Sequence, residues 1–281
     1  MKFANVSVLM SVYNLESPKN FREALNSMIN QTYIPRQFVI VRDGELGRDL
    51  DKVLNDFFEE FKDFVNITIV KLNQQVSLGN ALNAGLLVCE YPLIARMDSD
   101  DHAISNRIEL QTLFFQQEKK VKVLGAQIQE FTDTWEHPNG SRNVPIHSDQ
   151  IKRFSKTRNP LNHMTVMFRR DFIKKEMHGY RDIVGFEDYD LWLRVLKRQS
   201  DGVANLPQIL VAARTSSLQK RRGGVKYVRQ NAIARWSFYR DKLISFRHFI
   251  ITLSVGTIVG LSSSRFRMFL YKKVLRKNQL Y

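Results

Sequence analysis

The first hundred residues alternate apolar, β-branched runs with amphipathic stretches, and this alternation most constrains the fold. Strands are predicted over residues 6–12, 38–41, 66–72 and 93–97. Helices are predicted between them, over residues 21–29, 50–64 and 78–89. This alternation predicts the α/β class, with a Rossmann-like, mostly parallel central sheet flanked by helices. The ligand site of such a sheet lies outside the carboxyl ends of its strands.

Polar side chains follow these predicted strands where each one ends. Tyr13 follows the first strand, Asp43 the second, and Asp98, Asp100 and Asp101 the fourth. Three carboxylates within four residues repel one another unless a cation lies among them. Hard divalent cations bind carboxylate oxygens and keep open positions for phosphate. Mn²⁺ or Mg²⁺ together with a diphosphate is therefore the predicted occupant.

The residues alone leave open how these acids are used. The acidic turn also has a structural interpretation, because aspartate is a preferred cap for the helix predicted to begin near Asn106. The first glycine of the chain is Gly44. Neither the G-x-G-x-x-G fingerprint nor the P-loop can therefore follow the first strand. A nucleotide, if one binds, is held by other groups.

A second acidic cluster opens a predicted short helix at residues 185–198, which read GFEDYDLWLRVLKR. Glu187, Asp188 and Asp190 fall in its first turn, where the helix dipole stabilises carboxylates, so a purely structural role is possible. The functional interpretation is sharper. An ionised carboxylate at this position accepts a proton from a hydroxyl that a pocket holds within hydrogen-bond reach.

The positive charge of the chain is concentrated at its C-terminal end. The formal net charge is +15, and residues 214–281 contain sixteen Lys or Arg and one acid, Asp241. We therefore predict a nucleotide-binding and catalytic domain over residues 1–213 and a basic, helical region over residues 214–281. Such asymmetry predicts an anionic partner, either a membrane surface or nucleic acid.

Residues 249–261 distinguish these two partners. They form an apolar stretch of thirteen residues between basic flanks, whereas a membrane-spanning helix needs ~20 residues. We expect this stretch to lie at an anionic membrane interface; the alternative is an ordinary buried helix. Nucleic acid is not an expected partner, because no binding module accompanies the charge. The single cysteine, Cys89, and the absence of an apolar leader predict a reducing, cytoplasmic setting.

Six ordered motifs resemble the family 2 inverting glycosyltransferases of the GT-A fold. They are residues 6–14 (VSVLMSVYN), 27–33 (SMINQTY), 39–44 (VIVRDG), 78–85 (LGNALNAG), 95–101 (ARMDSDD) and 187–194 (EDYDLWLR). Residues 158–169 (RNPLNHMTVMFR) and 221–227 (RRGGVKY) further resemble the amylovoran and O-antigen branch. Members of that branch extend a lipid-linked sugar for bacterial surface polysaccharide, including capsule and exopolysaccharide, at the cytoplasmic face of the inner membrane.

The resemblance implies a role for each matching residue in binding the donor. Tyr13 and Asp43 match the residues that hold the uracil and ribose of a UDP-sugar, and Asn83 and Gly85 lie where a helix approaches the nucleotide. The acidic motif supplies the remaining groups. Its first acid, Asp98, is implied near the ribose, and its last, Asp100, at a Mn²⁺ or Mg²⁺ ion, a contact that Asp101 shares or replaces.

The resemblance also implies the catalytic base, which is Asp188, with Glu187 as the alternative. Arg221 and Arg222 are candidates for the diphosphate, because arginine forks match phosphate oxygens. His163 is interpreted as a hydrogen-bonded structural residue. The chain departs from the family in having Ser11 where a proline is common. It also lacks the Q-x-x-R-W motif of processive polymer synthases, which argues against chain polymerisation.

The function predicted from these residues is transfer of a hexose or N-acetylhexosamine, with inversion, from a UDP-sugar to a polyprenyl-diphosphate-linked saccharide. Two alternatives remain open at this point. A sugar-phosphate nucleotidyltransferase also needs carboxylates and Mg²⁺, but it usually has a glycine-rich loop after its first strand. A non-enzymatic basic scaffold for membrane or RNA would bind its partner regardless of Asp98, Asp100 and Asp188.

Overall fold

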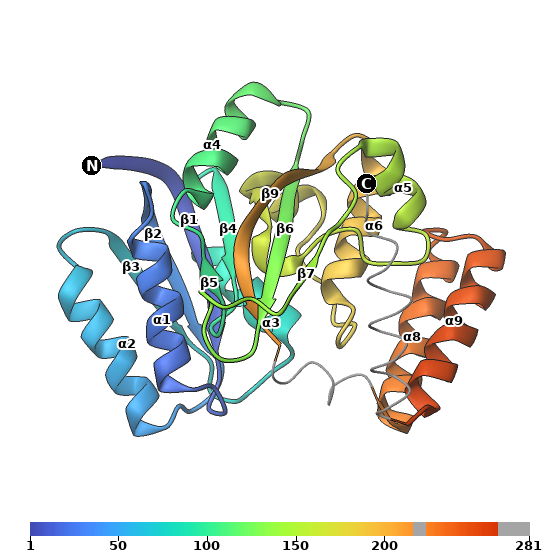
Figure 1. Cartoon of the computed structure of the whole chain (residues 1–281), viewed down its shortest axis with the longest axis horizontal. Helices are drawn as coiled ribbons and strands as arrows, with labels where there is room; N and C mark the ends of the chain where they lie inside the picture. Colours follow the sequence, from blue (N-terminus) through green and yellow to red (C-terminus); the bar gives the residue numbers. More distant parts are fainter. Residues whose placement is uncertain (216–222, 264–281) are drawn as a thin grey trace.

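The computed structural model describes residues 1–215 and 223–263, and Figure 1 shows them as a twisted central sheet with helices on both faces. Within these residues the strand order is β3-β2-β1-β4-β8-β6-β9-β5, and β7 pairs with β6. The strands are β1 (Lys2–Val12), β2 (Tyr33–Arg42), β3 (Asn66–Lys71), β4 (Leu93–Met97), β5 (His102–Ala103), β6 (Val123–Phe131), β7 (Gly140–Arg142), β8 (Met167–Arg169) and β9 (Val203–Arg214).

The helices follow the pattern predicted from apolar spacing and extend it beyond residue 100. They are α1 (Pro18–Ile29), α2 (Arg48–Phe61), α3 (Leu78–Val88), α4 (Arg107–Gln117), α5 (Ser148–Phe154), α6 (Glu187–Arg198), α8 (Val225–Arg240) and α9 (Phe246–Leu261). Two further single turns are η1 (His163–Thr165), of 3₁₀ type, and η2 (Phe172–Glu176), of π type. No helix among the described residues has both the length and the apolar character needed to cross a bilayer.

The four strands predicted from the first hundred residues are all present and form the parallel part of the sheet. β1 pairs in parallel with β2 and with β4, and β2 pairs in parallel with β3. The carboxyl ends of β1, β2 and β4 consequently lie at one edge. The other half is mixed, because β8 is antiparallel to both β4 and β6 whereas β9 is parallel to β6.

β2 begins before the predicted strand of residues 38–41 and includes Pro35. β3 pairs with β2 only from Gln37 onward. Pro35 therefore lies where β2 has β1 as a neighbour but not β3, and its missing N–H costs little there.

Two apolar layers enclose the sheet, and the two views show which helices form them. One layer lies between the sheet and α1, α2 and α4, and the other lies between the opposite face and α3, α5 and α6. Strand β1 contributes to both, with Val8 and Met10 in the first layer and Leu9 in the second. Burial on both faces explains why this strand is a continuous apolar run rather than an alternating one.

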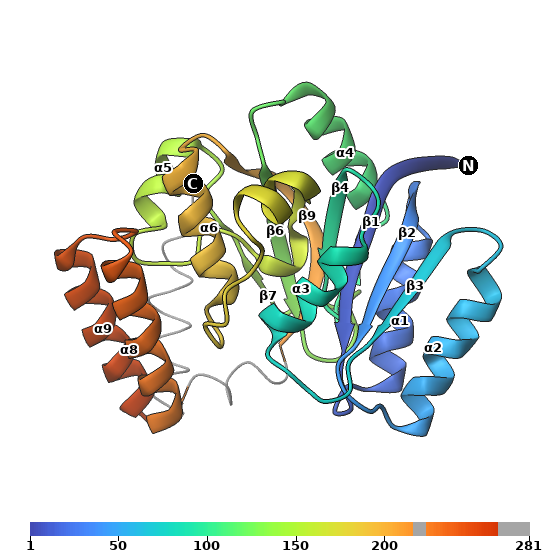
Figure 2. The same cartoon turned by 180° about the vertical axis from the view of Figure 1, so that it is seen from behind.

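The last two helices form an antiparallel hairpin at the side of the molecule remote from α2 (Figures 1 and 2). It packs on α6 through a third apolar cluster, which contains Tyr189, Leu193, Ala234, Phe238, Leu243, Ile244 and Phe249. The predicted boundary between residues 213 and 214 falls at the end of β9, where Arg214 is the last strand residue.

Candidate active site

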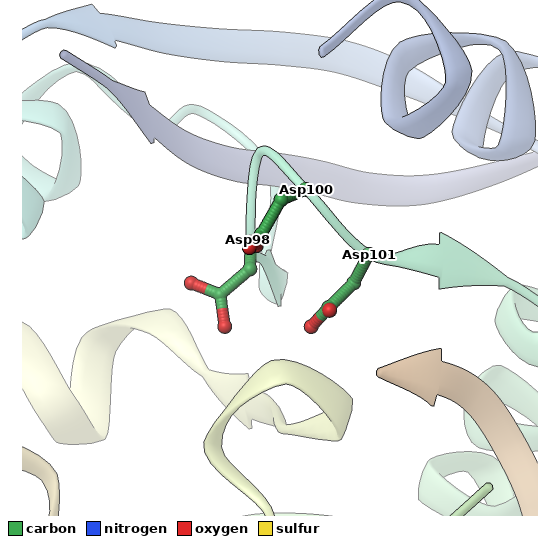
Figure 3. Close-up of side chains that lie close together, drawn as sticks. All are labelled: Asp98, Asp100 and Asp101. Carbon is green, nitrogen blue, oxygen red and sulfur yellow. The ribbon is translucent and has the colours of Figure 1, made fainter. Parts of the chain in front are cut away.

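The acidic turn between β4 and β5 gathers three carboxylates. Asp98, Asp100 and Asp101 each place one oxygen within 4.8 Å of the others, and Figure 3 shows them leaving the same turn. Asp101 is buried, and its Oδ2 lacks a hydrogen-bond partner within the described structure. Burial, together with the charges of Asp100 and Asp98, raises the pKa of Asp101 well above its ordinary value. An oxygen donor set with an unpartnered buried oxygen fits a hard divalent cation.

A buried arginine of β4 lies between this turn and the second acidic cluster. Arg96 is paired in register with Leu9 and therefore faces the layer beneath α3 and α6. It is 2% exposed and forms an ion pair with Asp98, while its Nε and Nη1 have no hydrogen-bond partner within residues 1–215 and 223–263. The charge of the same guanidinium also acts on Glu187 and Asp188, where it slightly opposes the rise in pKa that burial causes. Arg96 thus couples the two acidic clusters electrostatically.

A second buried arginine supports the end of β4 from the other side of the strand. Arg107 of α4 donates from Nη2 to the carbonyl of Arg96 (2.7 Å) and from Nε to Gln111 Oε1 (3.2 Å). Burial lowers its pKa to about 9. The backbone that leads into the acidic turn is therefore held by a buried arginine side chain.

Arg214, the last residue of β9, clamps the acidic turn. Its backbone N–H donates to Asp101 Oδ1 (2.8 Å) and its Nε donates to the carbonyl of Asp100 (3.2 Å). Its Nη2 donates to Glu23 Oε2 of α1 (3.2 Å), and its guanidinium lies 4.5 Å from the centroid of the Phe131 ring. Arg214 was not predicted as a site residue, because strands β4, β6 and β9 and helix α1 meet there only in the folded chain.

The first turn of α6 holds the second acidic cluster. Asp188 Oδ2 accepts a hydrogen bond from Asn159 Nδ2 (2.6 Å), and its Oδ1 accepts from the backbone N–H of Tyr189 (2.7 Å). Burial raises the pKa of Asp188 above its ordinary value, and these two hydrogen bonds oppose the rise. Asp190, in contrast, is fully buried and accepts from Arg194 Nε (2.7 Å) one helical turn away, so its role is structural.

Glu187 has the more perturbed carboxyl group of the pair. It is 9% exposed, and its Oε2 lacks a partner in the part of the chain that the structure describes. Burial, and next the charge of Asp188, raises its pKa to about 7. Glu187 Cβ also lies close to Gly79 of α3, where an added Cβ would be 3.3 Å away.

We predict that Glu187→Gln raises the free energy of unfolding at pH 8 by on the order of 3 kcal/mol, which follows from 1.36 kcal/mol per unit of pKa shift. Between pH 4.5 and 7 the folded state keeps a proton that the unfolded state has lost, so the stability of the natural protein falls as the pH rises. Denaturant unfolding from pH 4.5 to 8 measures this. The exposed Glu59→Gln is the control, and an unchanged pH dependence in Glu187→Gln would contradict the prediction.

Tyr180 joins the loop before α6 to helix α3. The side chain of Asn83 accepts from the Tyr180 N–H (2.8 Å) and donates to the Tyr180 carbonyl (2.8 Å). His163 Nε2 lies 3.1 Å from Tyr180 Oη, which confirms His163 as a hydrogen-bonded residue. Burial lowers the pKa of His163 well below its ordinary value and raises that of Tyr180, so both are neutral at physiological pH. Because both polar atoms of Asn83 bind Tyr180, we expect Asn83 to position the site rather than hold the nucleotide.

The other site residues predicted from the sequence lie outside the two acidic clusters. Asp43 follows β2 and accepts from the Val76 N–H (2.8 Å), and burial raises its pKa. Tyr13 is half-buried just after β1. A Cβ at Gly85 would lie 2.4 Å from Leu9 Cδ1, so this glycine lets α3 pack closely on the sheet. Arg221 and Arg222 lie outside the described residues.

A mostly parallel sheet with an acidic turn at a strand end and a further carboxylate at the start of a helix is the arrangement of a GT-A glycosyltransferase. The sequence model described as Glycosyl transferase family 2 matches residues 7–176. The chain therefore belongs to glycosyltransferase family 2, as the motifs predicted.

Full-length relatives support the same family. The UDP-Gal:α-D-GlcNAc-diphosphoundecaprenol β-1,3-galactosyltransferase of Escherichia coli is 36% identical over 272 residues, which cover 96% of each chain. The amylovoran biosynthesis glycosyltransferase AmsE of Erwinia amylovora is 33% identical, covering 95% of this chain and 98% of that one. The predicted likeness to the amylovoran branch is thereby confirmed.

A solved structure supports the fold. The mannosyltransferase PcManGT of Pyrobaculum calidifontis, in complex with GDP-Man and Mn²⁺, superposes with a TM-score of 0.63 at 13% identity. The match covers 91% of this chain and 70% of that one. The predicted GT-A fold is confirmed.

Proposed function

We propose that this glycosyltransferase moves a hexose or N-acetylhexosamine from a UDP-sugar to a polyprenyl-diphosphate-linked saccharide, in the synthesis of bacterial surface polysaccharide. The observation that carries the proposal is the cluster of three carboxylates at the end of β4, in which the buried Asp101 Oδ2 has no partner within the described structure. The UDP-Gal donor and the diphosphoundecaprenol acceptor named for the Escherichia coli relative support the choice of substrates.

Asp98, Asp100 and Asp101 would hold a Mn²⁺ or Mg²⁺ ion in this proposal. When bound, the ion supplies positive charge beside the diphosphate of the departing UDP. The unpartnered Asp101 Oδ2 supports this assignment, as does the Mn²⁺ named for the mannosyltransferase structure. The ion pair with Arg96 supplies one positive charge to a turn whose three carboxylates lie within 4.8 Å of one another.

Asp188 acts as the base. Its carboxylate accepts the proton of the acceptor hydroxyl, and the hydroxyl oxygen forms a bond to the anomeric carbon on the face opposite the departing UDP. The configuration at that carbon therefore inverts. Asn159 and the Tyr189 N–H orient the carboxylate and favour its ionised form. Glu187 is the alternative base, and its pKa of about 7 suits it to proton exchange near neutral pH.

The remaining assignments follow the family resemblance. Tyr13 and Asp43 would contact the uracil and ribose, and Arg221 and Arg222 the diphosphate. Residues 1–213 form the catalytic domain in this proposal, and residues 214–281 form a basic region that associates with an anionic membrane. The enzyme would then act in the cytoplasm or at the cytoplasmic face of the bacterial inner membrane.

A screen of UDP-sugars against N-acetylglucosaminyl-diphosphate-lipid tests the proposed reaction. We expect one UDP-sugar to yield UDP and a disaccharide lipid whose new linkage, determined by NMR, has the inverted anomeric configuration. Retention of configuration would remove the assigned role of Asp188. Nucleotide transfer from UTP to a sugar phosphate, without glycosyl transfer, would favour a nucleotidyltransferase instead.

We predict that Arg214→Met raises the half-saturating concentration of Mn²⁺ for transfer about tenfold, equivalent to about 1.4 kcal/mol. The apolar side chain cannot bond Asp100 or Glu23, so the acidic turn loses a clamp although its carboxylates remain. Arg240→Met, which removes an exposed cation paired with Asp241, is the matched control. A half-saturating concentration equal to that of the natural protein would show that the clamp does not position the turn.

A further inference from the structure

Helix α9 of the α8–α9 hairpin exposes apolar side chains and buries mostly small or polar ones. Five outward side chains of α9 are aliphatic and 42–64% exposed; they are Ile250, Ile251, Val255, Ile258 and Leu261. The other exposed residues of α9 are Phe246, Arg247 and Ser254. Its buried positions are mostly small or polar, and they include Thr252, Gly256 and Gly260. A helix at a water-exposed protein surface normally has the opposite arrangement, with polar residues outward.

The contact between the two helices follows the same pattern. An added Cβ at Gly256 would lie 2.2 Å from Asn231 Nδ2, and one at Gly260 would lie 2.6 Å from Val228 Cγ2. The two helix backbones approach closely because these glycines lack side chains. Small residues between helices and aliphatic residues outside them are typical of helices that associate in lipid.

Charge complementarity indicates what covers this surface. The exposed residues of α8 combine apolar Val225, Ile233 and Trp236 with basic Lys226 and Arg229. Neither helix contains an acidic residue. The intervening turn contributes exposed Lys242 and one acid, Asp241, which is paired with Arg181 and Arg240. Apolar side chains among cations match a bilayer with anionic headgroups, because the aliphatic groups enter the interface while the cations meet phosphate.

The hairpin also lies directly behind the proposed base. Tyr189, next to Asp188, donates from Oη to the carbonyl of Ser155 (2.6 Å) and stacks under the Arg235 guanidinium of α8 at 5.0 Å. Lys156 Nζ donates to the carbonyl of Leu243, in the turn of the hairpin (3.4 Å). A partner that binds the hairpin is therefore linked to the start of α6 through the contacts of Tyr189, Arg235 and Lys156.

We propose that one exposed face of the hairpin binds an anionic lipid bilayer. This face, here called the docking face, consists of Val225, Lys226, Arg229, Ile233, Trp236, Ile250, Ile251, Val255, Ile258 and Leu261. This inference rests on the proposed function, since a polyprenyl-linked acceptor presents its saccharide at a bilayer surface. The sixteen residues of α9 extend about 24 Å at 1.5 Å per residue, less than the ~30 Å of a hydrocarbon core, so the helix lies in the interface.

Vesicle sedimentation of the full chain tests the docking face at 0.15 M salt. We expect the natural protein to partition into phosphatidylglycerol-containing vesicles at least tenfold more strongly than into pure phosphatidylcholine vesicles. Val255→Glu/Ile258→Glu should lose at least tenfold of that binding. The control is Leu87→Glu/Leu113→Glu, which places the same charges on exposed apolar positions of α3 and α4 and should bind like the natural protein.

Transfer assays separate this inference from the proposed function. The docking-face variant should keep its rate on a short-chain, water-soluble acceptor and lose at least tenfold on the polyprenyl acceptor in vesicles. If the natural protein transfers sugar to the soluble acceptor but does not bind vesicles, the docking face alone is overturned. If the natural protein binds vesicles but transfers no sugar, the proposed reaction alone is overturned. A variant that binds vesicles normally but changes from dimer to monomer would assign the face to a second copy of the chain.

Discussion

Asp188→Asn is expected to lower kcat by about 10²–10⁴-fold, the range that general-base catalysis supplies, while UDP-sugar binding stays within a few fold. The amide cannot accept the acceptor proton, yet it keeps the shape of the carboxylate beside Asn159 and the Tyr189 N–H. Steady-state kinetics and calorimetric titration with UDP measure the two quantities. A near-normal kcat would move the base to Glu187.

Two further variants isolate the base. Glu187→Gln should retain most of kcat if Asp188 is the base, because Glu187 then contributes only charge.

Asn159→Ala should shift the acidic limb of the rate profile to higher pH, because it removes a hydrogen bond that lowers the pKa of Asp188. Activity requires the deprotonated base, so the rate falls as the pH drops through this pKa. An unshifted limb would show that the titrating group lies elsewhere.

Removal of divalent cations by a chelator is expected to lower transfer about 10³-fold, since several kcal/mol of transition-state stabilisation depend on the ion. Added Mn²⁺ or Mg²⁺ should restore activity. Asp100→Asn should reduce both the maximal rate and the binding of Mn²⁺ in the presence of UDP, followed by electron paramagnetic resonance.

Asp149→Asn is the control for the metal site, because that carboxylate is 83% exposed on α5 and lies outside the acidic turn. It should leave both Mn²⁺ binding and transfer unchanged. Full activity in the presence of chelator would contradict the assignment of Asp98, Asp100 and Asp101 as cation ligands. In that event the clamp by Arg214 and the ion pair with Arg96 would serve only to neutralise the turn.

Local pattern was sufficient to predict the parallel half of the sheet. Each strand there is rich in apolar or β-branched residues, and each helix has apolar residues at helical spacing, so a short stretch of sequence identifies them. The acidic turn was equally visible, because its three aspartates directly follow a strand. The mixed half was harder to predict: β8 has only three residues, and its position between β4 and β6 depends on long-range pairing.

The assignments that required the structure involve partners distant in the chain. Asn83 could not be linked to Tyr180 from sequence, since 97 residues separate them. Gly85 resembled a nucleotide-binding residue, yet its helical phase turns it toward Leu9 in the core. Arg96 was present within the quoted acidic motif, and its position two residues before Asp98 on the same face of a buried strand was a usable signal.

The order of residues by itself determined the α/β class, the family, the acidic turn and the concentration of cations after residue 213, because each is a local or compositional property. Only the tertiary structure decided which groups surround each carboxylate. Burial and the neighbouring charge of Asp188 raise the pKa of Glu187 to about 7, whereas Asp190, three residues further on, is paired with Arg194. Such differences arise from solvent exclusion and from contacts between distant elements, and neither is encoded in the spacing of residues along the chain.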